Sequence, residues 1–103
     1  MELDKAKKLL EALGKMQAEG RGEGLPCPRC GRDYMAANPV RNALSRRVKV
    51  YICDACGMDE AIRDMAGLEP LPLNQWAMSL SFTEEETDAM LACHSKYRVK
   101  EEK

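Results

Sequence analysis

The chain contains 103 residues, of which 45% are hydrophobic, 5% aromatic and 32% charged, and its formal net charge is −1. This length predicts one domain, or one small core with appendages. No window approaches the ~20 consecutive apolar residues that a membrane-spanning helix needs, which argues against an integral membrane protein.

The charges are divided unevenly along the chain. Residues 25–58 carry six basic and two acidic groups, whereas residues 59–103 carry five basic and ten acidic groups. Such an asymmetry says more about binding partners than the near-zero total does. The odd number of cysteines and the lack of a secretory signal indicate a reducing compartment, so we expect a cytoplasmic protein.

Residues 1–20 are predicted to form an amphipathic helix, because apolar residues recur at helical spacing among lysines and glutamates. Gly14 is expected to weaken this helix, and the glycine-rich residues 20–24 are expected to tie it only loosely to the cysteine-containing domain. We expect the apolar stripe to pack on that domain, with a dimer or a partner helix as the alternative. The stripe consists of Leu3, Ala6, Leu9, Leu10, Leu13 and, at its end, Met16 or Gln17.

The most informative stretch holds two Cys-x-x-Cys-Gly motifs, at residues 27–31 and 53–57. Two residues between cysteines let a tight turn aim both sulfurs at one centre, and the glycine after each pair is expected to adopt a left-handed conformation. Because four protein ligands fill a tetrahedral site, no position remains for catalysis. The motifs therefore predict one structural Zn²⁺ per chain, held by Cys27, Cys30, Cys53 and Cys56.

Three other uses of the cysteines stay open. Two disulfides are disfavoured by the odd count, a rubredoxin-like iron site uses the same ligands, and a thioredoxin-like redox pair would be single and lie beside a βαβ unit. Arg29 and Arg32 are expected to offset the negative charge of four thiolates around a metal. The metal-binding domain, residues 21–66, is small enough that we expect it to unfold without its ion.

The predicted fold class is α+β, with a small Cys₄ zinc ribbon or treble-clef-like β-hairpin core flanked by helices. Residues 33–36 and 48–52 are expected to be strands, and residues 41–47 a polar, basic loop or helical turn. The residues of the second strand that would face inward are Val48, Val50 and Ile52.

A short helix is expected over residues 58–66, with acidic residues in its first turn and Gly67 at its end. A helix that leaves the second cysteine pair favours the treble-clef-like topology, because an ordinary zinc ribbon would continue as a strand.

Residues 70–103 are predicted to form a C-terminal helical segment. A short helix over residues 73–80 carries Trp76, which we interpret first as a packing anchor. Thr83 and Glu86 form a capping box at the start of a longer helix that runs to about residue 99. Its apolar side would be Ala89, Met90, Cys93 and Tyr97. Cys93 and His94 are adjacent, but no acid or base is paired with them, so we expect no catalysis there.

Three segments together resemble a known group of proteins: Cys-Pro-Arg-Cys-Gly at residues 27–31, Asn-Ala-Leu-Ser-Arg at 42–46, and Tyr-Ile-Cys-Asp-Ala-Cys-Gly-Met-Asp-Glu-Ala at 51–61. They are similar to small zinc-ribbon proteins encoded by phages and prophages of gut Firmicutes. The resemblance implies a mobile-element origin, a bacterial host cell and bound zinc. Some small metal-binding phage proteins of this sort resemble anti-CRISPR inhibitors of the type II effector nuclease.

We therefore expect a non-enzymatic inhibitor that binds a host protein, namely a type II CRISPR effector nuclease, and blocks nucleic-acid loading or cleavage. Acidic side chains on two helices would dock into a basic channel of that partner. The candidate partner-binding residues are Asp59, Glu60, Asp64, Glu84, Glu85, Glu86 and Trp76.

The alternative is a nucleic-acid-binding accessory or transcription-regulatory protein, whose basic face would consist of Arg41, Arg46, Arg47 and Lys49. An enzyme fits least, because no nucleophile paired with a base and no phosphate-binding loop is visible. Neither a membrane nor a small-molecule substrate is expected.

Overall fold

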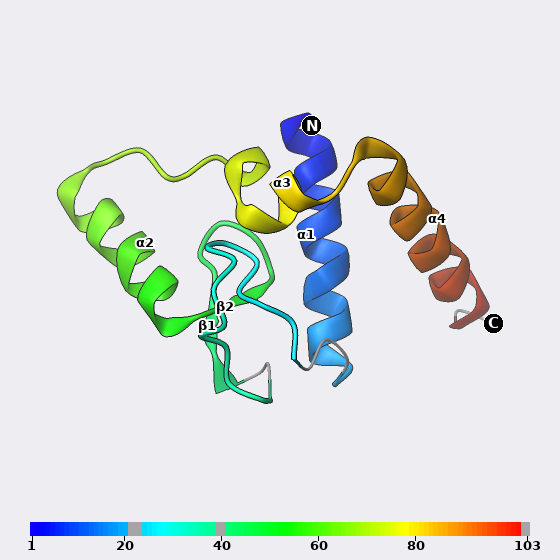
Figure 1. Cartoon of the computed structure of the whole chain (residues 1–103), viewed down its shortest axis with the longest axis horizontal. Helices are drawn as coiled ribbons and strands as arrows, with labels where there is room; N and C mark the ends of the chain where they lie inside the picture. Colours follow the sequence, from blue (N-terminus) through cyan, green and yellow to red (C-terminus); the bar gives the residue numbers. More distant parts are fainter. Residues whose placement is uncertain (21–23, 39–40, 102–103) are drawn as a thin grey trace.

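The computed structural model describes residues 1–20, 24–38 and 41–101, with side chains up to residue 92. Its elements in chain order are α1 (Leu3–Ala18), β1 (Ala43–Leu44), β2 (Tyr51–Ile52), α2 (Asp54–Ala66), the 3₁₀ helix η2 (Leu73–Gln75), α3 (Ala77–Ser81) and α4 (Glu84–Glu101). Figure 1 shows α1 near the centre, with the hairpin and α2 on one side and α4 on the other. None of the helices in the described ranges is long and apolar enough to cross a membrane.

The predicted α+β class is confirmed as a small antiparallel hairpin among helices. Strand β1 falls in the stretch that we expected to be a loop, and residues 33–36 form no strand, so both expectations are wrong. The N–H of Ser45 donates to the C=O of Val50 at 2.9 Å and closes a short connection, which costs less chain entropy than pairing with the distant residues 33–36. The register pairs Ala43 with Ile52 and Leu44 with Tyr51.

One hydrophobic core collects residues from all three predicted segments. Of the strand predicted over residues 48–52 only Tyr51–Ile52 is a strand, but the burial predicted for this stretch is confirmed on the inner side, because Val48, Val50 and Ile52 are buried and Lys49 is exposed. The apolar stripe of α1 packs on the domain, as expected. The core consists of Leu10, Leu13, Cys27, Val48, Val50, Ile52, Cys53, Cys56 and Trp76.

Helix α1 is fixed closely against the hairpin by its own residues, whereas the predicted flexible link at residues 20–24 lies largely outside the described residues. Gly14 is buried against the turn of the hairpin, where a Cβ atom would lie only 1.8 Å from the carbonyl oxygen of Lys49. One turn further, Gln17 accepts a hydrogen bond from the N–H of Tyr51 at 2.8 Å and donates one to the C=O of Tyr51 at 3.2 Å. The Gln17 side chain thus occupies the outer edge of β2 as a neighbouring strand would.

Helix α2 begins earlier than predicted, at Asp54 rather than at Met58, and ends before the left-handed Gly67 as expected. Gly31 has the predicted left-handed conformation, with φ of 78°. Gly57 does not, because it lies inside the first turns of α2. It is small for another reason: a Cβ atom there would lie 2.7 Å from the Cβ atom of Ala43 on β1.

The segment after α2 is helical but interrupted. The expected helix over residues 73–80 is divided into η2 and α3, because Trp76 between them is extended, with φ of −67° and ψ of 148°. Trp76 is completely buried, and its indole N–H donates to the C=O of Leu71 at 3.3 Å. Its interpretation as a packing anchor is therefore confirmed.

The capping box at the start of α4 is confirmed in both directions. The N–H of Thr83 donates to Glu86 at 2.9 Å, and the N–H of Glu86 donates to the Thr83 hydroxyl at 3.0 Å. Lys5 of α1 pairs with Asp88 of α4 at 2.8 Å. The predictions that concern the side chains of Cys93, His94 and Tyr97 lie outside the described residues.

Candidate metal centre

The four predicted ligands come together at one point of the core. The Sγ atoms of Cys27 and Cys56 lie 3.8 Å apart, those of Cys30 and Cys53 lie 3.9 Å apart, and all four are within 4.8 Å of one another. A tetrahedron of sulfurs around an ion with metal–sulfur bonds of about 2.3 Å has edges of about 3.8 Å. All four cysteines are free, so the two-disulfide alternative is not what the structure contains. The cluster therefore has the donor atoms and the close spacing with which it could hold a metal ion.

Two different local structures supply the two pairs of sulfurs. Cys27 and Cys30 lie on a turn that is closed by the N–H of Gly31, which donates to the C=O of Cys27 at 2.8 Å. Cys53 is the N-cap residue of α2, and Cys56 lies in the first turn of that helix. The positive end of the α2 dipole therefore faces the second pair, where it favours thiolates.

The surroundings of the sulfurs disfavour free thiolates, and a bound cation would stabilise them. Burial raises the pKa of the Cys27 and Cys56 thiols. The N–H of Cys53, 3.3 Å from the Cys27 sulfur, lowers the pKa of Cys27 but offsets the effect of burial there only in part. The pKa of Cys30 is lowered despite the cost of its burial, because the backbone N–H of Arg32 bonds to its sulfur. A bound metal ion deprotonates its cysteine ligands outright and so removes the cost of burying them.

Arg29 supplies positive charge next to the sulfurs, as predicted. Its side chain is 7% exposed, its Nη2 lies 2.5 Å from Asp59, and it also bonds to the sulfur of Cys56. Arg29, assisted by Arg63, holds the pKa of the Asp59 carboxyl below its usual range. The side chain of Arg32 does not offset the charge of the sulfurs as predicted. It is exposed and lies 5.8 Å above the ring of Tyr34.

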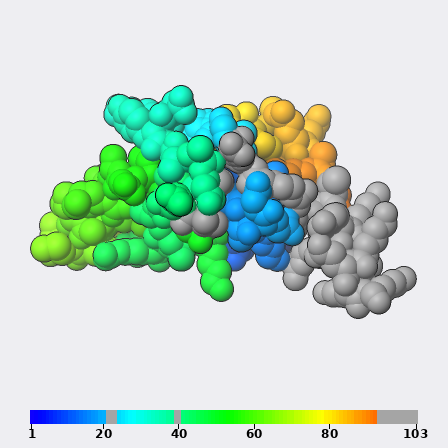
Figure 2. All heavy atoms as spheres, turned by 90° about the horizontal axis from the view of Figure 1, so that it is seen from below, coloured from blue at the N-terminus to red at the C-terminus, as the bar shows by residue number. Residues whose placement is uncertain are grey.

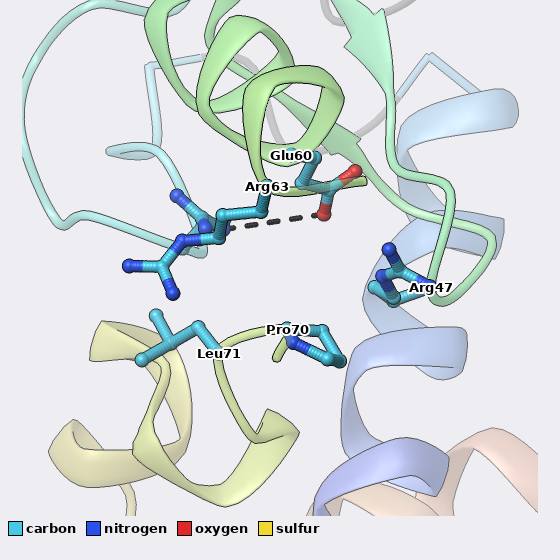
Figure 3. A pocket seen from close by; sticks show the side chains of 6 residues that line it. Arg47, Glu60, Arg63, Pro70 and Leu71 are labelled. Carbon is cyan, nitrogen blue, oxygen red and sulfur yellow. Dashed lines mark ion pairs between the residues drawn. The ribbon is translucent and has the colours of Figure 1, made fainter. Parts of the chain in front are cut away.

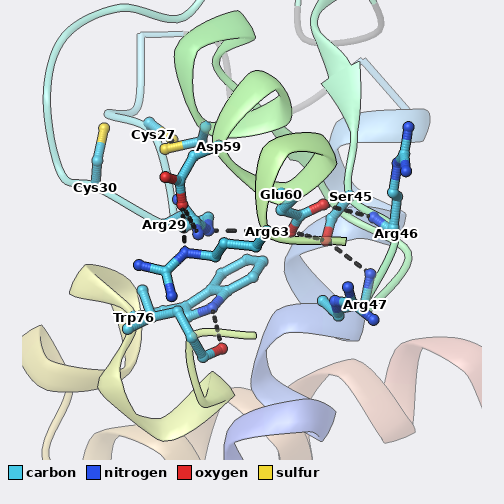
Figure 4. Close-up of polar contacts among 12 residues, drawn as sticks. Cys27, Arg29, Cys30, Ser45, Arg46, Arg47, Asp59, Glu60, Arg63 and Trp76 are labelled. Carbon is cyan, nitrogen blue, oxygen red and sulfur yellow. Dashed lines mark hydrogen bonds and ion pairs between the residues drawn. The ribbon is translucent and has the colours of Figure 1, made fainter. Parts of the chain in front are cut away.

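The polar side of α2 is held to the hairpin by a network of ion pairs and hydrogen bonds (Figure 4). Buried Glu60 accepts hydrogen bonds from the Ser45 hydroxyl and from the N–H of Arg46, each at 2.8 Å. Asp64 pairs with Arg46 at 3.2 Å and with Arg47. The contacts join one side of α2 to the residues that come directly after β1.

A small hollow lies beside this network, and Figure 3 shows Arg47, Glu60, Arg63, Pro70 and Leu71 around it. The hollow is too small to admit a water molecule. These arginines therefore serve the packing of α2, and the hollow is not a ligand site.

The predicted partner-binding residues fall into three groups. Glu60 is 3% exposed and Trp76 is 0% exposed, so these two are not on the surface and the expectation that they lie on a contact face needs correction. Asp59 and Asp64 are partly exposed but form ion pairs within the chain. The acidic residues on the surface at the start of α4 are Glu84, Glu85 and Glu86. Their role in binding stays a prediction.

The predicted basic face is divided in the same way. Arg46 and Arg47 pair with Asp64, whereas Arg41 and Lys49 are exposed. Lys49 lies with Tyr51 on the wall of a groove of about 270 Å³ between α1 and the hairpin. Sequence reasoning missed the structural partners Gln17 and Ser45, since polar residues of these types carry no signal of a distant contact.

No known protein family, no curated protein and no solved structure matches this chain.

Proposed function

We propose that the chain binds one structural Zn²⁺ and acts as a non-enzymatic inhibitor that binds a protein partner. The observation that carries the first part is the group of four sulfurs within 4.8 Å of one another. Four thiolates in a tetrahedral arrangement are the ligand set of structural zinc, with iron as the competing ion. Zinc catalysis needs a coordination position open to water or substrate, and here protein ligands would occupy all four.

The order of the elements supports a treble-clef-like domain rather than a zinc ribbon. A turn with the first cysteine pair comes first, the hairpin of β1 and β2 is next, and the second pair lies at the N-terminus of α2. A ribbon would place both pairs on turns between strands. In this arrangement the ion joins the turn to the helix, and removal of the ion would separate them.

Two features support a protein partner. The resemblance to phage-encoded zinc proteins implies a bacterial host, and some small metal-binding phage proteins of this sort resemble anti-CRISPR inhibitors of the type II effector nuclease, which is the partner proposed here. Glu84 and Glu85, on the first turn of α4, are exposed acidic groups suited to a basic nucleic-acid channel. Occupying that channel would block the loading of nucleic acid or its cleavage. The alternative of a nucleic-acid-binding protein is weakened because Asp64 pairs with both Arg46 and Arg47 and offsets part of their positive charge.

Metal analysis of the purified, untagged protein tests the first part. We expect one zinc ion per chain by elemental analysis, and loss of that ion when any one of the four cysteines is replaced by serine. Stoichiometric iron would correct the identity of the metal, and the absence of any metal would refute the proposal.

A guide-loading assay with a purified type II effector nuclease tests the second part. We expect the protein to bind the nuclease and reduce its loading of guide RNA, and the double variant Glu84→Lys/Glu85→Lys to lose this effect. Glu69→Lys, an exposed charge reversal on the connector after α2, is the matched control. The inhibitor proposal fails if the wild-type protein leaves loading and target cleavage unchanged. Salt-sensitive binding of the free protein to DNA or RNA would support the alternative instead.

A further inference from the structure

Helix α2 is held to the rest of the chain by polar contacts. Figure 1 shows α2 at one end of the molecule, and Figure 2 shows its green surface at the left edge. A helix on the surface of a globular protein normally buries an apolar face, but Met58 is 63% exposed, Ile62 53% and Met65 88%. The buried residues of α2 are Cys56 and Glu60. The contacts of these two side chains therefore decide how the helix is held.

One side chain, that of Arg29, reaches both of them. Arg29 belongs to the turn between Cys27 and Cys30, so it approaches α2 from the first pair of metal ligands. Its guanidinium bonds to the sulfur of Cys56, and its Nε lies 4.0 Å from the Glu60 carboxylate. The Arg29 side chain is 7% exposed, so these charges meet largely away from water. A buried charge without partners is strongly destabilising, and here each group serves the other.

Further contacts fix the position of the guanidinium (Figure 4). Its Nη2 lies 2.5 Å from Asp59, and the same carboxylate oxygen lies 2.9 Å from the Nε of Arg63. At the backbone, the N–H of Ala77 donates to the C=O of Arg29 at 3.2 Å. A guanidinium presents several N–H donors in fixed directions, so it can bond to a carboxylate and to a sulfur at once, whereas a lysine ammonium lacks this planar fork.

The donors to the sulfurs differ in kind. The sulfurs of Cys27 and Cys30 receive backbone N–H groups, from residues 53 and 32 respectively. The sulfur of Cys56 receives a charged donor, the guanidinium of Arg29. Hydrogen bonds from a charged donor are stronger than those from a neutral one, and four thiolates around a divalent metal carry a net negative charge. Of these three donors, Arg29 therefore gives the metal site its strongest support.

We propose that Arg29 is a positioning residue of the metal site, which sets the affinity of the four cysteines for zinc through the sulfur of Cys56 and is held there by Asp59. This role rests on the proposed zinc site and adds to it a residue outside the four ligands. It also gives Asp59, which the sequence suggested for partner binding, a function within the chain. Because Arg29 contacts a metal ligand and the polar side of α2 together, metal binding and the attachment of α2 reinforce each other.

Substitution of Co²⁺ for zinc gives a readout that a purely structural role would not change. Tetrahedral Co²⁺–thiolate sites absorb by charge transfer from sulfur to metal, and a hydrogen bond to a sulfur lowers the energy of its lone pairs. Arg29→Met should therefore move this band to longer wavelength. In competition with a chelator of known affinity, it should raise the dissociation constant of zinc by about 10–100-fold. Arg29→Lys keeps the charge without the planar fork, so it should fall between the wild type and Arg29→Met in both readouts.

Arg32→Met is the matched control, because it removes a neighbouring arginine whose exposed side chain lies over Tyr34, and it should leave both readouts unchanged. The role of Arg29 is overturned if Arg29→Met keeps the wild-type band, with or without a loss of affinity, or if Arg32→Met has the same effects. Should Arg29→Met bind no cobalt, a wild-type band in Arg29→Lys overturns the role instead. Failure of the wild-type protein to bind cobalt is a separate outcome, which would refute the metal site itself and this role with it.

Discussion

Replacing Gly14 by alanine gives the sharpest test of how α1 meets the hairpin. Helix propensity alone predicts that Gly14→Ala stabilises the protein by ~1 kcal/mol, because glycine is a poor helix former. The structure predicts the opposite sign. The new Cβ atom would lie 1.8 Å from the carbonyl oxygen of Lys49, 2.9 Å from the carbonyl carbon of Lys49 and 3.2 Å from the Cα atom of Val50.

These atoms belong to the backbone, so no side-chain rotation relieves the clash and α1 must move away from the hairpin. Overpacking of a filled site costs ~1–3 kcal/mol. The movement also strains the two hydrogen bonds between Gln17 and Tyr51, each of which contributes about 1 kcal/mol. After subtracting the gain in helix propensity, we expect a net destabilisation of about 2 kcal/mol. For a domain of this size that lowers the thermal midpoint by about 8–16 °C.

Thermal and urea unfolding, at fixed zinc concentration and under reducing conditions, measure this effect, because bound metal shifts apparent stability by mass action. Lys15→Ala, at the next and exposed position of α1, is the control and should leave the midpoint nearly unchanged. Gly57→Ala should lower the midpoint less than Gly14→Ala does, since its Cβ atom would meet only the Cβ atom of Ala43, at 2.7 Å. A rise in the midpoint of Gly14→Ala would refute the close packing of α1 on the hairpin.

Three further outcomes are expected from the metal cluster, the Gln17 contact and the capping box. Removing the metal with a chelator, or replacing Cys53 by serine, should unfold the hairpin and α2, because structural zinc contributes on the order of 10–16 kcal/mol to such domains; unchanged far-ultraviolet circular dichroism would contradict this. Gln17→Met should cost about 2–3 kcal/mol in urea unfolding and speed amide exchange at Tyr51, whose N–H and C=O lose their partner; unaltered exchange would count against the contact. The backbone N–H and the hydroxyl of Thr83 hold the pKa of Glu86 below its usual value, so the capping box contributes fully above the unfolded pKa and is lost as pH falls through the folded pKa. An NMR titration of the Glu86 carboxyl should show the lowered pKa in the wild type and in Thr83→Ser, and a less strongly lowered pKa in Thr83→Ala, which keeps the backbone N–H of residue 83 but loses the hydroxyl.

The features that sequence reasoning predicted correctly are those whose contacts are local. The sulfurs of each cysteine pair are three residues apart, and Thr83 and Glu86 bond across one helical turn. The two cysteine pairs lie far apart in sequence, yet their association was predictable, because one tetrahedral ion takes two closely spaced thiolate pairs as its four ligands. In each of these cases the chemistry of the residues themselves dictates the partner.

The features that were missed depend on contacts between distant segments. No local pattern distinguishes a glycine that weakens a helix from Gly14, which lets the backbone of Lys49 approach. Strand β1 was assigned to a loop because its two paired residues are too few to show an alternating pattern. Glu60 was expected on the surface because glutamate is rarely buried unless paired, and its partners Ser45 and Arg46 come from another part of the chain.

The metal cluster and the acidic residues of α2 together account for how this helix is held to the rest of the domain. Most helices are held to their domain by an apolar face, but α2 is held by the sulfurs of Cys53 and Cys56 and by Asp59 and Glu60 beside them. Since these contacts are made by sulfur, charge and hydrogen bonds, the apolar side of the helix is not needed for folding. It is therefore free to bind another surface.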